Sequence, residues 1–357
     1  MMFPFLFIII RPPTNDAVPP AKSSFAASAF VIMVEVWLAL LFIVSATKVQ
    51  KKKQPCKKTY ARIWATYQMC ALKNQNAAII QFGKQNLVLS FCYRIFAAMF
   101  EKEIKEYEDI RKEYQQKIAD RMGKKEWMEY NEILFSAQSC AIEGNSFTVD
   151  DTRILREQGM AMIPVGRSLL ECTEMADHFR AFDYMVSHLD IPFDEPLLKE
   201  VNRLVTEHTL SYRAPDGIAG EYTTEDMAAG DTVFGDHETL IARVPNLMAS
   251  TQKALDNGQH PMIVAAKWHG YYEYLHPFRD GNGRTGRLLS NFILLRAGHP
   301  LLIIKLEDRS EYISALKMIR TEGTDEHLVA FFFKTAINRM ESELAQKRKN
   351  TLPTMFF

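Results

Sequence analysis

The chain has 357 residues, of which 47% are hydrophobic, and it carries 43 basic and 43 acidic residues. This length accommodates about two domains, and the zero net charge gives no reason to expect a nucleic-acid partner. The charge is unevenly distributed along the chain, because residues 1–100 hold twelve Lys and Arg but only Asp16 and Glu35 as acids. Two regions of such different composition are not expected to share one core.

The N-terminal region contains one apolar run that is long enough to cross a bilayer. Phe25–Val44 is twenty residues long with Glu35 as its single charge, and about 20 apolar residues span a membrane. Six lysines follow between Lys48 and Lys58, so the positive-inside rule puts the rest of the chain in the cytoplasm. The sequence therefore predicts a single-pass anchor at residues 25–44, with the part of the chain after it in the cytoplasm.

A second interpretation of this region stays open. A glutamate at mid-span costs about 2.5–3.5 kcal/mol on insertion scales, which argues against a membrane helix. Residues 1–98 are then an extension upstream of the natural start, since Met99 stands directly before a well-patterned charged helix.

From Met99 onward the hydrophobic periodicity is that of helices. In the first of them, apolar side chains recur every three or four residues, at Ile104, Tyr107, Ile110 and Tyr114. Strand signals are confined to residues 217–240, so we expect an all-α fold with a short β-hairpin. Helices are expected at residues 101–124, 127–141, from 151 onward, 173–188, 195–209, 264–275, 284–297, 310–321 and 326–346.

The cysteines do not form a metal site or a disulfide framework. Five are present, an odd number without metal-ligand spacing, and this pattern predicts free thiols in a reducing compartment. They are Cys56, Cys70, Cys92, Cys140 and Cys172.

The most informative stretch is His276–Arg287, which we call the signature loop. It places a base, a carboxylate, a glycine turn and two arginines directly before an apolar helical run. Gly281 and Gly283 let the backbone fold closely around an anion, and a helix N-terminus adds partial positive charge. The loop therefore predicts a phosphate site, although it lacks the Lys-Ser/Thr ending of a P-loop.

The side chains of the signature loop suit the same ligand. Arg284 and Arg287 lie three residues apart on the first helical turn, and their forked donors match phosphate oxygens. Asp280 offers the hard oxygen that Mg²⁺ prefers. His276 can accept a proton at neutral pH, and the amide of Asn282 can donate to a phosphate oxygen.

The signature loop resembles the motif of the Fic family, His-x-Phe-x-Asp/Glu-Gly-Asn-Gly-Arg-x-x-Arg, and matches it at every fixed position. Fic proteins are mostly adenylyltransferases that move AMP from ATP to a hydroxyl side chain of a target protein. The resemblance makes His276 the general base and Asp280 the Mg²⁺ ligand. It also implies an anion hole, formed by Asn282 and the backbone at Gly281 and Gly283. Arg284 and Arg287 would hold the β- and γ-phosphates.

Residues 139–144 resemble the inhibitory motif of the same family, Ser/Thr-x-x-x-Glu-Gly/Asn. Ser139, Glu143 and Gly144 match its fixed positions. The resemblance implies that Glu143 pairs with Arg287, so that the γ-phosphate of ATP cannot be held productively. Its place before the core identifies an N-terminal inhibitory helix.

Two further segments are similar to parts of the family. Gly217–Tyr222, leading into Thr232–Leu240, resembles the flap, a hairpin that aligns the target by strand addition. The family commonly has Arg after the tyrosine, whereas this chain has Thr223. Arg309–Leu316 resembles the helix that lines the adenine pocket, with Tyr312 as a candidate contact to the base, although an aromatic residue at helical spacing also suits the core.

These patterns predict an auto-inhibited, Mg²⁺-dependent protein adenylyltransferase. The expected layout is residues 1–98, a helical region at 99–194 with the inhibitory motif, and a catalytic core at 195–346. Expected partners are ATP, an unidentified protein substrate and a second copy of the chain. The alternatives are removal of AMP or transfer of another phosphate-bearing group at the same site, and a non-catalytic module that senses nucleotide.

Overall fold

The computed structural model describes residues 99–229 and 232–348. The chain divides into two compact units, Met1–Ala71 and Leu72–Phe357, and every described residue belongs to the second. The predicted apolar span at residues 25–44 therefore lies outside the described residues. Among the helices that are described, none combines the length and the apolar character needed to cross a bilayer.

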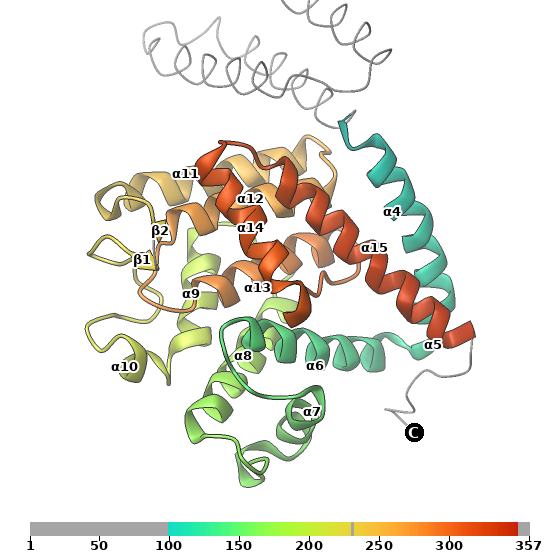
Figure 1. Ribbon diagram of the computed structural model, residues 1–357, viewed down its shortest axis with the longest axis horizontal. Coiled ribbons are helices and arrows are strands. Elements are labelled where there is room, and N and C mark those ends of the chain that lie inside the picture. Colours follow the sequence, from blue (N-terminus) through green and yellow to red (C-terminus); the bar gives the residue numbers. More distant parts are fainter. Residues whose placement is uncertain (1–98, 230–231, 349–357) are drawn as a thin grey trace, which may run out of the picture. The chain divides into compact units, whose positions relative to one another are not determined.

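The first part of the described unit is a broken helix followed by a long one. A single helix was expected at residues 101–124, but the chain turns through a π-helical segment and stops at Gly123, whose φ of +87° ends the helix. The elements are α4 (Glu101–Tyr114), η1 (Gln115–Ala119), α5 (Asp120–Met122) and α6 (Lys124–Ile142). Figure 1 shows α4 lying along α15 (Glu326–Arg348).

Two helices pack against the second half of α6. They are α7 (Val149–Gln158) and α8 (Leu169–Ser187), joined through η2 (Gly159–Ala161). The start of α7 was expected after Asp150, but the cap is Thr148, which shares a capping box with Asp151. The thiols of Cys140 and Cys172 are free and buried in a small apolar cluster between these helices.

The remaining elements surround a central helix pair, α12 and α13. The hairpin is shorter than expected, because β1 and β2 pair antiparallel through only Ala228↔Val233 and Ala229↔Thr232. Helix α11 was not expected, since its first residue, Leu240, was assigned to the hairpin region and Pro245 lies inside the helix. The bounds are α9 (Glu195–Thr206), α10 (Leu210–Arg213), β1 (Ala228–Ala229), β2 (Thr232–Val233), η3 (His237–Thr239), α11 (Leu240–Asp256), α12 (Pro261–Leu275), α13 (Asn282–Arg296), η4 (Leu306–Asp308) and α14 (Arg309–Thr321).

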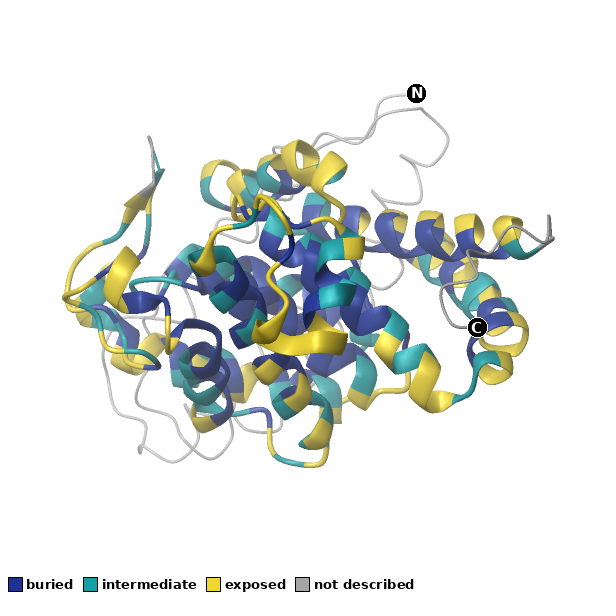
Figure 2. Ribbon diagram, turned by 90° about the horizontal axis from the view of Figure 1, so that it is seen from below, coloured by how far each residue is buried: buried dark blue, intermediate teal, exposed yellow. Residues whose placement is uncertain are grey.

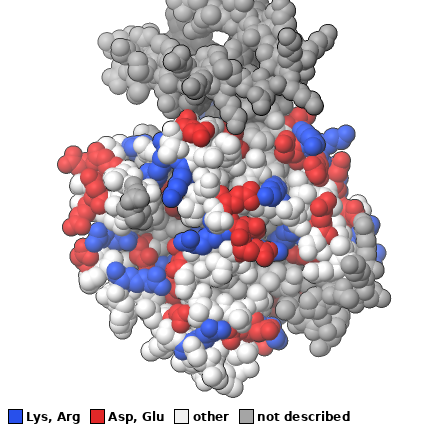
Figure 3. Space-filling view, in the orientation of Figure 1, with Lys and Arg blue, Asp and Glu red and all other residues white. Residues whose placement is uncertain are grey.

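The core lies around α12 and α13, most of whose residues are buried. Figure 2 shows the buried residues gathered in the middle of the described part of the chain. Trp268 stacks on Tyr272 and meets Phe193 edge to face, so α12 is fixed to the start of α9 by aromatic contacts. The surface is mixed in sign, with acidic and basic side chains interspersed over the face in Figure 3. The all-α prediction is confirmed, and the buried helix pair gives the loop between α12 and α13 a rigid base.

Candidate active site

The signature loop connects the two most buried helices, α12 and α13. His276 ends α12 in the left-handed region at φ 49°, and it is the one non-glycine residue with positive φ in the described part of the chain. Gly281 precedes α13 at φ 76°, where a Cβ would lie 2.5 Å from the Cγ2 atom of Thr206. Phe278 is 1% exposed and anchors the loop in the core. The turn therefore requires glycine at position 281.

Two asparagines hold the shape of this loop. The Asn282 amide donates to the Phe278 carbonyl at 2.7 Å, and its oxygen accepts from the Phe278 N–H at 3.0 Å. These bonds leave one of its two amide hydrogens for an anion, so its phosphate role stays a prediction. Asn202 on α9 donates to the Asp280 carbonyl at 3.0 Å and accepts from the Gly220 N–H at 3.2 Å. Asn202 was not predicted, because only the fold brings it to the loop.

Arg284 is held by two carboxylates. Its side chain is 1% exposed, with Glu174 at 2.7 Å and Asp280 at 3.0 Å. Burial lowers the pKa of Arg284, but the two carboxylates outweigh it and raise that pKa above its ordinary value. Glu174 also pairs with Arg213 at 2.8 Å. The sequence did not indicate Glu174 or Arg213, which come from α8 and α10.

Arg287 is bound to the end of helix α6. Its guanidinium donates to the Glu143 carboxylate at 2.8 Å, to the Ser139 carbonyl at 2.8 Å and to the Ser139 hydroxyl at 3.1 Å. Burial lowers the pKa of Arg287, but Glu143 outweighs this effect and raises it. The two segments that the sequence paired, residues 139–144 and the signature loop, are therefore in direct contact.

The Glu143 carboxylate lies at the N-terminus of α13, against Gly283. A Cβ at position 283 would overlap this carboxylate and also lie 2.8 Å from the Arg287 guanidinium. Gly144 supplies the left-handed turn that ends α6, with φ +100°. A helix N-terminus attracts anions, so Glu143 occupies a position that suits a phosphate.

Asn145 joins the inhibitory segment to the other arginine. Its amide donates to the Glu174 carboxylate at 2.8 Å and to the Glu171 carbonyl at 3.1 Å. Because Glu174 pairs with Arg284, the end of α6 is linked to both arginines of the signature loop. Nothing in the sequence pointed to this link, because Asn145 is an ordinary polar residue after Gly144.

Tyr312 lies in the core behind Arg287. It is 1% exposed, and its hydroxyl meets the Nε2 atom of His269 at 2.5 Å. Burial raises the pKa of Tyr312 and lowers that of His269 to about 4. Its expected contact with an adenine ring stays a prediction, since its ring is covered in this conformation.

The hairpin region is fastened to the signature loop by backbone pairing. Tyr222 forms an isolated antiparallel bridge with Phe278, and the Thr223 N–H donates to the Pro277 carbonyl at 2.8 Å. Thr223 is 5% exposed, so the position where the family has Arg is buried here. Arg279 adds ion pairs to Asp216 at 2.6 Å and to Glu225.

The donor set of the loop fits Mg²⁺ bound together with phosphates. Asp280 presents a partly exposed carboxylate, and one of its oxygens accepts a hydrogen bond from Arg284 at 3.0 Å. Mg²⁺ typically uses one or two carboxylates, substrate phosphates and waters. A single hard carboxylate beside an anion site satisfies that requirement.

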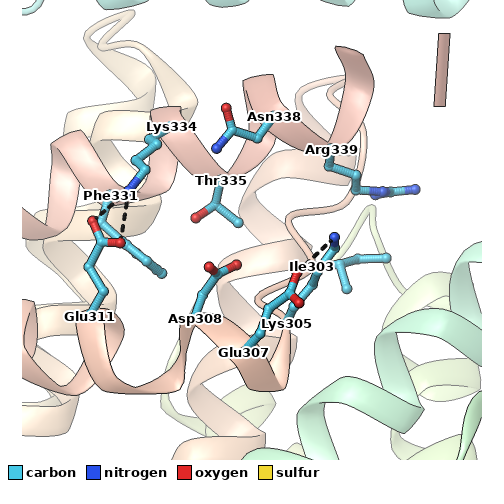
Figure 4. A pocket seen from close by; sticks show the side chains of 10 residues that line it. All are labelled: Ile303, Lys305, Glu307, Asp308, Glu311, Phe331, Lys334, Thr335, Asn338 and Arg339. Atoms are coloured by element: carbon cyan, nitrogen blue, oxygen red, sulfur yellow. Dashed lines mark hydrogen bonds and ion pairs between the residues drawn. The ribbon is translucent and has the colours of Figure 1, made fainter. Parts of the chain in front are cut away.

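A cavity of about 110 Å³ lies apart from the signature loop. Figure 4 shows it between η4, α14 and α15, where Lys334 pairs with Glu311 and Lys305 pairs with Glu307. Its charges are thus largely paired with each other, and no signature residue lines it. We assign it no role.

Residues 192–294 match the model of the Fic/DOC family. Two curated relatives named "Protein adenylyltransferase Fic" are similar. The protein from Nematostella vectensis is 35% identical over 191 residues, covering 50% of this chain and 41% of that one. The protein from Drosophila grimshawi is 36% identical over 201 residues, covering 54% and 39%. The chain thus spans about two fifths of these relatives.

Solved structures share the fold. A Fic domain containing signaling protein from Bacteroides thetaiotaomicron has a TM-score of 0.59 at 25% identity, and the match covers 70% of this chain and 97% of that one. Residues 134–508 of Fic-1 from C. elegans give a TM-score of 0.58 at 24% identity, covering 75% and 79%.

Proposed function

Because residues 192–294 form a domain of the Fic/DOC family, we propose that this chain is a protein adenylyltransferase that uses ATP and Mg²⁺. One observation carries the proposal. A base, a carboxylate and two buried arginines converge on the N-terminus of one helix, through His276, Asp280, Arg284 and Arg287. The curated relatives are named for the same activity.

The reaction follows from these groups. His276 accepts the proton of a target hydroxyl, whose oxygen then attacks the α-phosphorus of ATP. The bond between the α-phosphorus and the bridging oxygen breaks, and pyrophosphate leaves. Arg284, Arg287 and the backbone of α13 stabilise the charge that develops on the phosphates. Mg²⁺ held by Asp280 would supply further positive charge there.

The proposal includes auto-inhibition. The inference rests on the place of Glu143, whose carboxylate pairs with Arg287 at 2.8 Å and lies against Gly283. An ATP phosphate that used the same arginine would have to displace this carboxylate, since both are anions that need the same donors. Transfer therefore requires the contact between Glu143 and Arg287 to open.

The test uses ATP labelled either on its α-phosphate or on its γ-phosphate, with the Glu143→Gly variant. Adenylyl transfer leaves the α-label in protein and releases the γ-label, and adding His276→Ala abolishes both effects. Retention of the γ-label would identify a kinase-type transfer instead. If the parent chain releases AMP from a pre-modified target and the Glu143→Gly variant does not, the result would favour AMP removal. Nucleotide binding without any label would point to a sensing module.

The expected homodimer is part of the same proposal, and an exposed apolar loop supports it. In the segment between α7 and α8, the side chains of Met162 and Val165 are 53% and 100% exposed. We infer that this exposed apolar loop is where two copies of the chain meet. Sedimentation velocity of Val165→Asp tests this interpretation, because the variant should be monomeric at concentrations where the parent chain pairs.

A further inference from the structure

Glu273 lies one helical turn before His276, on the same helix α12. Its Oε2 atom is 3.6 Å from the Nδ1 atom of His276, and the two side chains are only 12% and 20% exposed. Nδ1 is buried and makes no hydrogen bond to another group among the described residues. The separation is slightly longer than a hydrogen bond, as is common for catalytic contacts before substrate binds.

The charged form of Glu273 is favoured at this buried place. Burial raises the pKa of Glu273, but His276, His269 and Arg287 outweigh it and hold that pKa below its ordinary value. Tyr272 on α12, and Tyr312 and Arg320 on α14, also sense the charge of this carboxylate. A buried carboxylate with its charge retained is a strong acceptor for a ring N–H.

The imidazole of His276 is held in one plane. The ring of Phe234, directly after β2, stacks on it with 3.8 Å between centroids and 18° between planes. The Arg320 guanidinium lies 4.6 Å from the centre of the Phe234 ring. Arg320 also donates to the carbonyls of Val233 at 3.1 Å and Glu273 at 2.7 Å. This arrangement restricts the ring and keeps Nδ1 beside Glu273.

The backbone of His276 adds to this restraint. Its left-handed conformation is costly for a residue with a side chain, and such residues persist where the surroundings enforce them. The position of the ring is thus set by the backbone, by Phe234 and by the contact at Nδ1.

We propose that Glu273 is a positioning residue whose carboxylate keeps the proton on Nδ1 of His276, so that Nε2 is the nitrogen that accepts the target's proton. In a neutral imidazole one nitrogen donates and the other accepts, so a bond at Nδ1 decides which nitrogen is basic. The same carboxylate then stabilises the imidazolium formed when His276 takes the proton. This inference rests on the proposed function, since it assumes that His276 is the base.

The decisive measurement is the tautomer of His276 in the full chain, read from nitrogen chemical shifts of ¹⁵N-histidine-labelled protein. The signal is assigned by its loss in His276→Gln. We expect the Nδ1-protonated form in the parent chain and a shift toward the Nε2-protonated form in Glu273→Gln. The control Glu322→Gln, at an exposed carboxylate after α14, should leave the spectrum unchanged. An Nε2-protonated His276 in the parent chain would overturn the proposal, even if Glu273→Gln failed to fold.

Activity supplies the second readout, in the Glu143→Gly background. Glu273→Gln should lower kcat about tenfold, part of the 10²–10⁴-fold that general base catalysis contributes, with the KM for ATP within about twofold of the parent. A raised KM with unchanged kcat would mean that Glu273 serves nucleotide binding, and would contradict a positioning role. If Glu143→Gly itself transfers no AMP, the proposed function fails, whereas the tautomer measurement still decides the role of Glu273.

Discussion

Replacing Glu143 with glycine removes the carboxylate that is bound to Arg287 in this structure. The pair is close, at 2.8 Å, and it is asymmetric in exposure, because the Glu143 side chain is 34% exposed and that of Arg287 only 4%. Arg287 keeps its contacts with Ser139 in the variant. The freed donors and the N-terminus of α13 become available to a phosphate of ATP.

The magnitude of the effect follows from the strength of that pair. A hydrogen bond to a charged group contributes about 1.5–3 kcal/mol, and solvent around Glu143 puts this one at the lower end, about 1.5 kcal/mol. Because about 1.4 kcal/mol corresponds to a factor of ten in binding, the affinity for ATP should rise about tenfold.

Isothermal titration with ATP and Mg²⁺ measures this change. The parent chain and the Glu143→Gly variant are compared, and both carry His276→Ala so that no turnover disturbs the titration. The control Glu157→Gln removes an equal charge at an exposed position near the end of α7 and should leave the affinity unchanged. An affinity for the Glu143→Gly protein within twofold of its parent would refute the argument that Glu143 and ATP compete for Arg287.

Three further outcomes are expected. Asp280→Ala should lower the transfer rate at least about 100-fold in the Glu143→Gly background, because metal charge contributes several kcal/mol; a loss below tenfold would remove Asp280 as the metal ligand. Asn202→Ala should lower the free energy of unfolding in urea by roughly 2–4 kcal/mol, because it leaves buried partners on the signature loop unpaired, whereas the exposed Asn257→Ala should change little. The unfolding free energy should also fall as pH drops from about 6.5 to about 4. Burial lowers the pKa of His269 to about 4, so above pH 6.5 this residue is neutral in both the folded and the unfolded chain. Below pH 6.5 the unfolded chain binds a proton that the folded chain does not, which lowers the unfolding free energy by roughly 3 kcal/mol by pH 4; a flat profile in this window would contradict the buried, neutral state of His269.

The signature loop could be assigned from the sequence because its chemistry lies within twelve consecutive residues. The contact between Glu143 and Arg287 was also expected, although only through the resemblance to a family. Glu174, Asn145 and Asn202 could not be found in this way. Each is an ordinary polar residue on its own helix or turn, and it acquires a role only where packing brings it to Arg284 or to the loop.

Some helices could likewise be predicted from the sequence, and others could not. Long periodic segments such as those of α8, α12 and α15 were predicted, because an apolar stripe at helical spacing is a local signal. Helix α11 was missed, since Pro245 lies inside it and it follows directly after the short hairpin. The break in the first helix was missed as well, because a π-helical turn at residues 115–119 preserves the apolar stripe while changing the spacing of its hydrogen bonds.

We propose that the signature loop transfers AMP and that Glu143 restrains this transfer. Intact-mass analysis of the Glu143→Gly chain, incubated with ATP, Mg²⁺ and a cell lysate, tests both parts at once. We expect a mass gain of one AMP group on the chain itself or on a lysate protein, absent when His276→Ala is added and weaker with the parent chain. No AMP adduct on any protein, or an equal yield with the parent chain, would contradict it.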